Sequence, residues 1–192
     1  MKNIWRAITI QNKRFEEERM KAQTLAETLQ REAKKSVHLL VHRRLLNVSE
    51  KLRLLREEVA CLLGMVKKNP LLHHIGAIDD GLEEYAEFVA LAVFLEKNSS
   101  MAAFVKGISS EALIGGIADA TGELVRIARA KMDEKEGENI REHIISVYHH
   151  LLDLPITRNG KLRSKTEDVR RNLLRTEEIL FDIRIRAHSS AG

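Results

Sequence analysis

The chain has 192 residues, of which 44% are hydrophobic and 31% are charged, with a formal net charge of +4. This balance excludes a disordered chain, and the apolar run over residues 85–95 is too short to span a bilayer. The single cysteine, Cys61, excludes an intramolecular disulfide and indicates a reducing compartment. Because the N-terminal stretch has no uninterrupted apolar segment typical of a signal peptide, we expect a cytoplasmic protein.

Helical periodicity dominates the first half of the chain. Residues 12–63 are charged and amphipathic, with Leu, Val and Ala spaced three and four apart and room for a break near residues 47–49. Residues 1–11 are expected to be a flexible end. Cys61, set among apolar neighbours, is expected to be packed in the core. Asn69 followed by Pro70 is typical of a helix start, which predicts a helix from there to Lys97.

The second half has the same character and ends in a flexible tail. Residues 98–100 (Asn-Ser-Ser), the polar segment 133–138 and the Thr-Arg-Asn-Gly turn at 157–160 interrupt the pattern. Between them we expect helices over residues 109–132, 139–152 and 162–185, with residues 187–192 flexible. Since strand-like alternation is missing from the sequence, we predict an all-α bundle of six or seven helices forming one domain over residues 1–192.

Four acidic residues interrupt otherwise apolar helical segments. Glu84 and Glu87 are three residues apart and Asp119 and Glu123 are four apart, so each pair lies on one side of its helix. We expect Glu84 and Glu87 to lean toward the interior and Glu83 to sit closer to solvent. Burying a carboxylate is costly unless a cation or hydrogen bonds compensate, so these acids require an explanation.

Paired carboxylates on two antiparallel helices would form an all-oxygen site suited to Mg²⁺ or Mn²⁺. Two such ions can activate water and stabilise the leaving oxygen in phosphodiester hydrolysis, and one carboxylate could take the proton of the water. The plainer interpretation is a buried ion-pair network in which the acids meet Arg126, Arg129 or another cation. A di-iron site is disfavoured, because none of the eight His residues follows a Glu by three positions.

Basic residues gather ahead of these acids. Residues 31–56 hold eight Lys or Arg and two acids, whereas residues 76–125 hold two Lys and nine acids. A basic stripe can follow a phosphate backbone without regard to sequence, and the scarcity of aromatics favours a duplex or structured RNA over a single strand. The alternative is an ordinary solvated helix face. The candidate nucleic-acid-binding residues are Arg31, Lys34, Lys35, His38, His42, Arg43 and Arg44.

Several segments resemble the translin superfamily, and in particular its subunits of the translin-associated factor X type. Residues 81–87 read Gly-Leu-Glu-Glu-Tyr-Ala-Glu, similar to Gly-Leu-Gln-Glu-Tyr-Val-Glu in that subunit. The most specific segment is 116–126, Gly-Ile-Ala-Asp-Ala-Thr-Gly-Glu-Leu-Val-Arg, which resembles Gly-Val-Ala-Asp-Leu-Thr-Gly-Glu-Leu-Met-Arg. Residues 35–43 and 169–184 are similar to its first and closing helices, so the resemblance covers about residues 25–186.

This resemblance implies a translin-like all-α fold that assembles into a hollow barrel, usually an octamer. It also implies an Mg²⁺-dependent endoribonuclease that cleaves RNA inside the barrel, with Glu84, Glu87, Asp119 and Glu123 as metal ligands and catalytic residues. The chain lacks the long insertion that the eukaryotic factor has between its acidic helices. We therefore expect a homo-oligomer that needs no separate translin subunit.

Two alternatives stay open at the level of sequence. The first is a non-catalytic, translin-like oligomer that binds RNA or DNA, which would show salt-sensitive binding without cleavage. The second is an all-α nucleotide pyrophosphohydrolase, although its second acid pair is usually spaced three residues apart, whereas Asp119 and Glu123 are four apart. A purely structural bundle would leave the interior acids without a cause.

Overall fold

A computed structural model describes residues 1–131, 133–155 and 160–189. Across these ranges the chain forms six α-helices and two short 3-10 helices and no strand, which confirms the all-α prediction. The elements in chain order are α1 (Lys2–Val41), α2 (Val48–Lys68), η1 (Pro70–His74), α3 (Gly76–Leu95), η2 (Ser99–Val105), α4 (Ser110–Lys131), α5 (Glu134–Asp153) and α6 (Gly160–Ser189).

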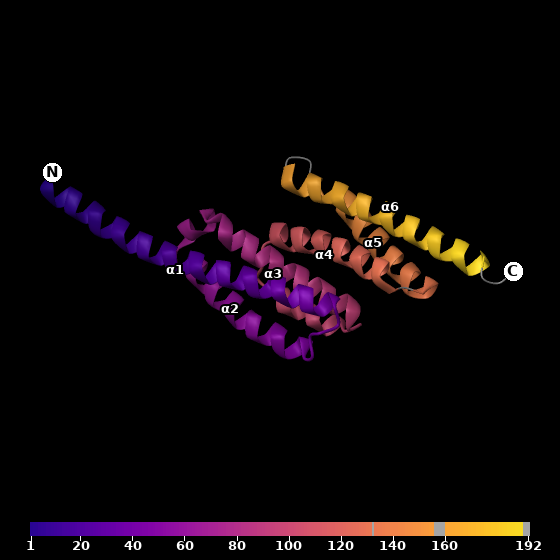
Figure 1. Cartoon of the computed structure of the whole chain (residues 1–192). Coiled ribbons are helices and arrows are strands. Elements are labelled where there is room, and N and C mark those ends of the chain that lie inside the picture. Colours follow the sequence, from indigo (N-terminus) through magenta and orange to yellow (C-terminus); the bar gives the residue numbers. More distant parts are fainter. Residues whose placement is uncertain (132, 156–159, 190–192) are drawn as a thin grey trace.

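Helices α3 and α4 form the centre of the bundle. On one side α1 packs along α3 and α2 packs on α1, while on the other side α6 packs along α4 and α5 packs on α6 (Figure 1). The α3–α4 seam is therefore flanked by α1 and by α6. A site at this seam can receive side chains from four elements that are far apart in the sequence.

Helices α3 and α4 run in the same direction, so the antiparallel arrangement expected from the sequence is wrong. Positions later along α3 meet positions later along α4: Glu83 lies against Gly115, and Glu87 shares a hollow with Glu123. The connection over residues 96–109 runs back along α3, where the Tyr85 hydroxyl donates to the carbonyl of Phe104 at 3.4 Å. This connection is long enough to return the chain to the starting end of α3 before α4 begins.

Several helix boundaries differ from the expected ones, and local capping explains two of them. Asn69 caps η1 rather than α3, by accepting a hydrogen bond from the backbone of Leu71 at 3.3 Å. The segment 133–138 is mostly helical instead of a polar connection, because Asp133 accepts from the backbone N–H of Glu136 at 2.8 Å and starts α5 early. The predicted break near residues 47–49 is confirmed: α1 ends at Val41, and Asn47 caps α2.

The N-terminal end of the chain is helical, contrary to the expected flexible end. Helix α1 already begins at Lys2, so residues 1–11, expected to be a flexible end, are helical almost throughout, and all of them are exposed. Figure 1 shows this end of α1 extending beyond the rest of the bundle. Of the predicted turn at 157–160, residues 157–159 lie outside the described residues and Gly160 begins α6. Of the flexible tail predicted at 187–192, residues 187–189 belong to α6, and residues 190–192 lie outside the described residues.

The core is built from apolar rows on each helix. Helix α1 buries small residues, including Ala22, Ala26 and Ala33. It approaches α3 closely, because a Cβ atom at Gly81 would lie 2.7 Å from the carbonyl oxygen of Ala26. On α2 the buried row contains Val59 and Leu62 instead of Cys61, which is exposed, so the expectation of a core thiol is wrong. No helix in the described part of the chain is long and apolar enough to cross a membrane.

Candidate functional site

Three of the four predicted acids line one small hollow at the α3–α4 seam. Glu84 and Glu87 of α3 and Glu123 of α4 face a cavity of about 270 Å³. Asp119 does not line this hollow, but it lies close enough to Glu87 that its charge acts on that carboxyl. The structure thus brings all four acids to one region. The remaining lining residues are Lys34, Val37 and His38 from α1 and Arg126 from α4.

Two glycines on α4 make this convergence possible. A Cβ atom at Gly116 would lie 2.5 Å from the carbonyl oxygen of Glu83 and 2.6 Å from the backbone nitrogen of Glu87. A Cβ atom at Gly115 would lie 2.5 Å from the carboxyl carbon of Glu83. At Gly116 a larger side chain would meet the backbone of α3 and force the helices apart, whereas at Gly115 it would displace the carboxylate of Glu83, so Gly116 fixes the distance between the two acid pairs.

The position of Glu83 differs from the one predicted from the sequence. Instead of facing solvent it is buried, with 8% of its surface exposed, in the space that Gly115 leaves open. Lys161 and Lys165 of α6 approach its two carboxylate oxygens at 2.7 and 2.9 Å. Burial raises the pKa of Glu83, but the hydrogen bonds from the two lysines outweigh it and hold that pKa below its ordinary value.

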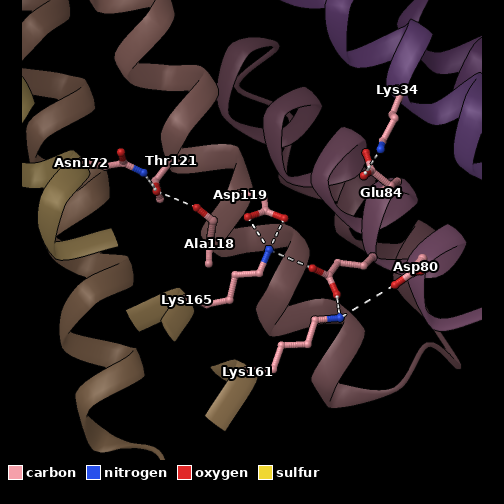
Figure 2. Close-up of polar contacts among 10 residues, drawn as sticks. Lys34, Asp80, Glu84, Ala118, Asp119, Thr121, Lys161, Lys165 and Asn172 are labelled. Atoms are coloured by element: carbon pink, nitrogen blue, oxygen red, sulfur yellow. Dashed lines mark hydrogen bonds and ion pairs between the residues drawn. The ribbon is translucent and has the colours of Figure 1, made fainter. Parts of the chain in front are cut away.

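Three of the four acids each have a basic partner (Figure 2 shows those of Glu84 and Asp119). Lys34 on α1 pairs with Glu84 at 3.0 Å. Lys165 on α6 bonds both oxygens of Asp119, at 2.6 and 2.5 Å.

On α4 itself, Arg126 bonds both oxygens of Glu123 at 2.7 and 2.8 Å. These three acids therefore form ion pairs, one of them with Arg126 as the plainer interpretation expected, but the network is not buried, because the side chains of Lys34 and Arg126 are more than half exposed. Among the described residues Arg129 forms no ion pair with any of them.

Glu87 is different, because no Lys or Arg within the described ranges forms an ion pair with it. Its exposed fraction is 9%. Burial, together with the charges of Glu84, Asp119 and Glu123, raises its pKa to about 8. Burial is also the main cause that raises the pKa values of Glu84 and Asp119. The hollow thus concentrates carboxyl groups that resist being charged together.

The donor chemistry of this hollow fits a hard divalent cation. Carboxylate oxygens are the ligands that Mg²⁺ and Mn²⁺ prefer, and a bound cation would relieve the repulsion that raises the pKa of Glu87. In the described part of the chain, however, no three His, Cys, Asp or Glu side chains are already grouped as metal ligands. Binding would therefore require carboxylates to turn away from Lys34, Lys165 or Arg126.

The predicted basic residues are all exposed, and two of them reach the acids. Lys34 and His38 line the acidic hollow, and the ring of His42 lies 4.4 Å from that of His38, further along α1. Arg43, in the turn after α1, pairs with Glu136 at 3.2 Å. The stripe therefore leads along the surface of α1 directly to the carboxylates. Its remaining members, Arg31, Lys35 and Arg44, extend the positive surface.

Sequence reasoning missed the contribution of α6. Lys161 and Lys165 are four residues apart on one face, but nothing in their spacing says that this face meets α3 and α4. A buried hydrogen bond from Asn172 to Thr121, at 2.9 Å, holds α6 on α4 close to Asp119 (Figure 2). Contacts between α6 and helices α3 and α4, which are far apart from it in the sequence, depend on the packing of the whole bundle.

Comparison with known proteins identifies the family of the chain. A family model described as Translin family matches residues 1–187. The chain belongs to the Translin family. This confirms the resemblance carried by the acidic segments and by the first and closing helices. Comparison with curated proteins finds no match.

Solved structures confirm the fold of this Translin-family chain. AfC3PO matches with a TM-score of 0.80 and 19% identity, covering 95% of this chain and 97% of that one. A structure of AfC3PO with duplex RNA matches with a TM-score of 0.79 and 18% identity over the same shares. Apo-NeC3PO matches with a TM-score of 0.80 and 18% identity, covering 92% of this chain and 95% of that one.

Proposed function

We propose that this Translin-family chain is a metal-dependent endoribonuclease that acts as a homo-oligomer in the cytoplasm. The observation that carries the proposal is the acidic hollow at the α3–α4 seam, where a buried carboxyl with a pKa of about 8 lies among three other acids. A protein that needed these residues only for stability would gain by replacing Glu87 with an apolar side chain. The presence of a carboxyl at this position is explained if it binds a cation.

Each group in and around the hollow has a role in this proposal. Glu84, Glu87, Asp119 and Glu123 would hold Mg²⁺ or Mn²⁺. When bound, such ions lower the pKa of water and neutralise charge on a leaving oxygen. Glu87, the most enclosed of the four acids, is suited to keep or release a proton at its carboxyl. Lys34 and His38 border the hollow on the α1 side and are placed to meet a phosphate group.

RNA is the substrate that the surface supports. The stripe of Arg31, Lys34, Lys35, His38, His42, Arg43 and Arg44 would contact phosphates and lead the backbone to the acids. A fold relative, AfC3PO, has been solved with duplex RNA. A shape-reading surface with few aromatics suits a duplex or a structured single strand.

The proposed assembly is a hollow homo-oligomer, in the simplest case an octamer. Exposed apolar side chains support self-association. On the projecting end of α1 these are Ile4, Trp5 and Ile8, and on α6 they include Leu174 and Phe181. Exposed apolar surface can serve as an interaction site.

Cleavage of labelled single- and double-stranded RNA tests the activity. The wild type should cut in Mg²⁺ and stop in EDTA, and the Glu84→Ala/Glu87→Ala double variant should bind RNA but lose at least about a hundredfold in rate. Glu96→Ala, at the exposed end of α3, is the matched control and should cut like the wild type. Wild-type rates from the double variant would sink the assignment of the site.

The same assay separates the alternatives. Tight, salt-sensitive RNA binding by the wild type without cutting at any Mg²⁺ or Mn²⁺ concentration would establish the non-catalytic oligomer. Release of pyrophosphate from free nucleoside triphosphates, with RNA left intact, would establish the pyrophosphohydrolase. Membership in the Translin family favours the two nucleic-acid functions over this last one.

A further inference from the structure

We propose that Lys165 acts as an exchangeable counter-ion of the acidic site. While the site is free of metal, Lys165 neutralises Asp119. When a divalent cation binds Asp119, Lys165 leaves Asp119 and pairs with Glu83 alone. This inference rests on the proposed metal site. It assigns roles to two residues outside the four predicted acids and predicts that they act on metal affinity in opposite directions.

Lys165 bridges a carboxylate of the site and one outside it. Its Nζ lies 2.6 and 2.5 Å from the two oxygens of Asp119 and 2.9 Å from Oε1 of Glu83 (Figure 2 shows the lysine facing Asp119). Its side chain is 18% exposed, so water replaces these contacts poorly. A cation seeking Asp119 must compete with an ammonium group that is already in place.

Glu83 and Asp119 differ in how easily each can release Lys165. Glu83 is enclosed against Gly115 and also receives Lys161 at 2.7 Å, so it has little freedom to turn. Asp119 has 37% of its side chain exposed, and it lies close enough to Glu87 for their charges to interact. Asp119 is therefore the partner that can exchange Lys165 for another cation, and Glu83 is the partner that stays.

The packing of α6 prevents Lys165 from leaving altogether. Asn172, two turns further along α6, donates a buried hydrogen bond to Thr121 on α4 at 2.9 Å. This bond holds α6 against the helix that carries Asp119. Exchange at Asp119 must then occur by movement of the lysine side chain, with Glu83 receiving the charge that Asp119 releases.

Opposite effects on metal affinity follow. Lys165→Met removes the competitor at Asp119, so we expect Mn²⁺ to bind on the order of tenfold more tightly. Glu83→Gln removes the alternative acceptor, so Lys165 is held by Asp119 alone and Mn²⁺ should bind several-fold more weakly. In the Glu83→Gln/Lys165→Met double variant the effect of Glu83→Gln should disappear, because it acts through the lysine.

The experiment measures Mn²⁺ binding to the full-length chain without RNA, from the free Mn²⁺ signal in electron paramagnetic resonance. Two controls carry the same charge changes but leave the contact between Lys165 and Asp119 intact. Lys161→Met removes a cation that contacts Glu83 but not Asp119, and Asp80→Asn removes an acid near Lys161. Each should change the affinity by less than about twofold. Thermal unfolding checks each fold, and Lys165→Gln replaces the Met variant if that one does not fold.

Equal effects of Lys161→Met and Lys165→Met would overturn the inference, since charge alone would then explain them. Additive effects in the double variant would overturn it as well, because Glu83 would then act without the lysine. The Glu84→Ala/Glu87→Ala variant distinguishes failure of the metal site itself. If that variant binds Mn²⁺ like the wild type, the proposed function falls. If the Glu84→Ala/Glu87→Ala variant loses Mn²⁺ binding while Lys165→Met leaves the affinity unchanged, the metal site stands and only the counter-ion role of Lys165 is rejected.

Discussion

At the scale of the residue, Glu87 stands out among the described acids, because it is buried and forms no ion pair with a Lys or Arg of the described ranges. Its native pKa of about 8 lies well above the ordinary value of 4.5, because of burial and the neighbouring acids. Between these two values the folded protein binds a proton that the unfolded chain has released. The free energy of unfolding must therefore fall as pH rises from about 4.5 to about 8, and the loss is complete above the native pKa.

Glu87→Gln should remove this pH dependence. The amide stays neutral at every pH, so the variant should be more stable than the wild type above pH 8, by a few kcal/mol. Below about pH 4.5 the difference between the two proteins should level off. Urea denaturation at a series of pH values measures this, with exposed Glu96→Gln as a control that follows the wild type. Parallel curves for Glu87→Gln and the wild type would contradict the assignment.

The four acids could be found from the sequence because carboxylates in apolar helical runs are conspicuous. Glu83 could not be placed, although it adjoins them in the chain. Its burial depends on the missing side chain of Gly115 and on two lysines of α6. Helical periodicity says which neighbours share a face of one helix, but it does not say which face another helix will cover.

At the scale of the element, the approach of α3 to α4 depends on Gly116. Gly116→Ala would place a Cβ within 2.6 Å of backbone atoms of Glu83 and Glu87, which cannot yield as a flexible side chain would. We expect a loss of about 1–3 kcal/mol in the free energy of unfolding, together with weaker Mn²⁺ binding as the acid pairs separate. Chemical denaturation and metal titration measure the two effects.

Gly64→Ala is the matched control for that substitution. Gly64 lies inside α2, and a Cβ there would meet nothing within 4 Å. Because alanine favours the helix over the unfolded chain, this variant should gain about 0.5–1 kcal/mol and bind Mn²⁺ as before. If both variants were equally stabilised, the close contact at Gly116 would not control the helix spacing.

The extents of the helices could largely be predicted, since apolar residues recur at helical spacing throughout the chain. The relative direction of α3 and α4 could not. It depends on the path of residues 96–109, which return along α3 through η2 and the contact between Tyr85 and Phe104. Sequence signals mark where such a connection begins and ends, but its route is decided by packing between segments.

At the scale of the whole molecule, the projecting end of α1 bears on assembly. Ile4, Trp5 and Ile8 lie on one side of this helix, while Ile10 lies on the other, and all four are exposed. We expect the occupant of the first face to be a second copy of this chain, as the proposed homo-oligomer requires. An isolated helical end of this length would be marginal in water without such a contact.

Ile8→Glu should therefore weaken assembly. A charge within the contact should raise the protein concentration at which the oligomer dissociates by at least about tenfold. Light scattering over a dilution series measures this, and Ile10→Glu provides the same change on the opposite side, where the mass should stay that of the wild type. A loss of mass in both variants, or in neither, would contradict a one-sided contact.

The length of α1 has a mechanical consequence. Its 40 residues form one uninterrupted rod of about 60 Å. Trp5 near one end and Lys34 near the other are separated by about 44 Å along the same axis. Because Lys34 pairs with Glu84 at 3.0 Å, the exposed apolar end and one wall of the acidic hollow belong to the same helix. A second copy that binds the exposed end would therefore hold the helix that carries Lys34.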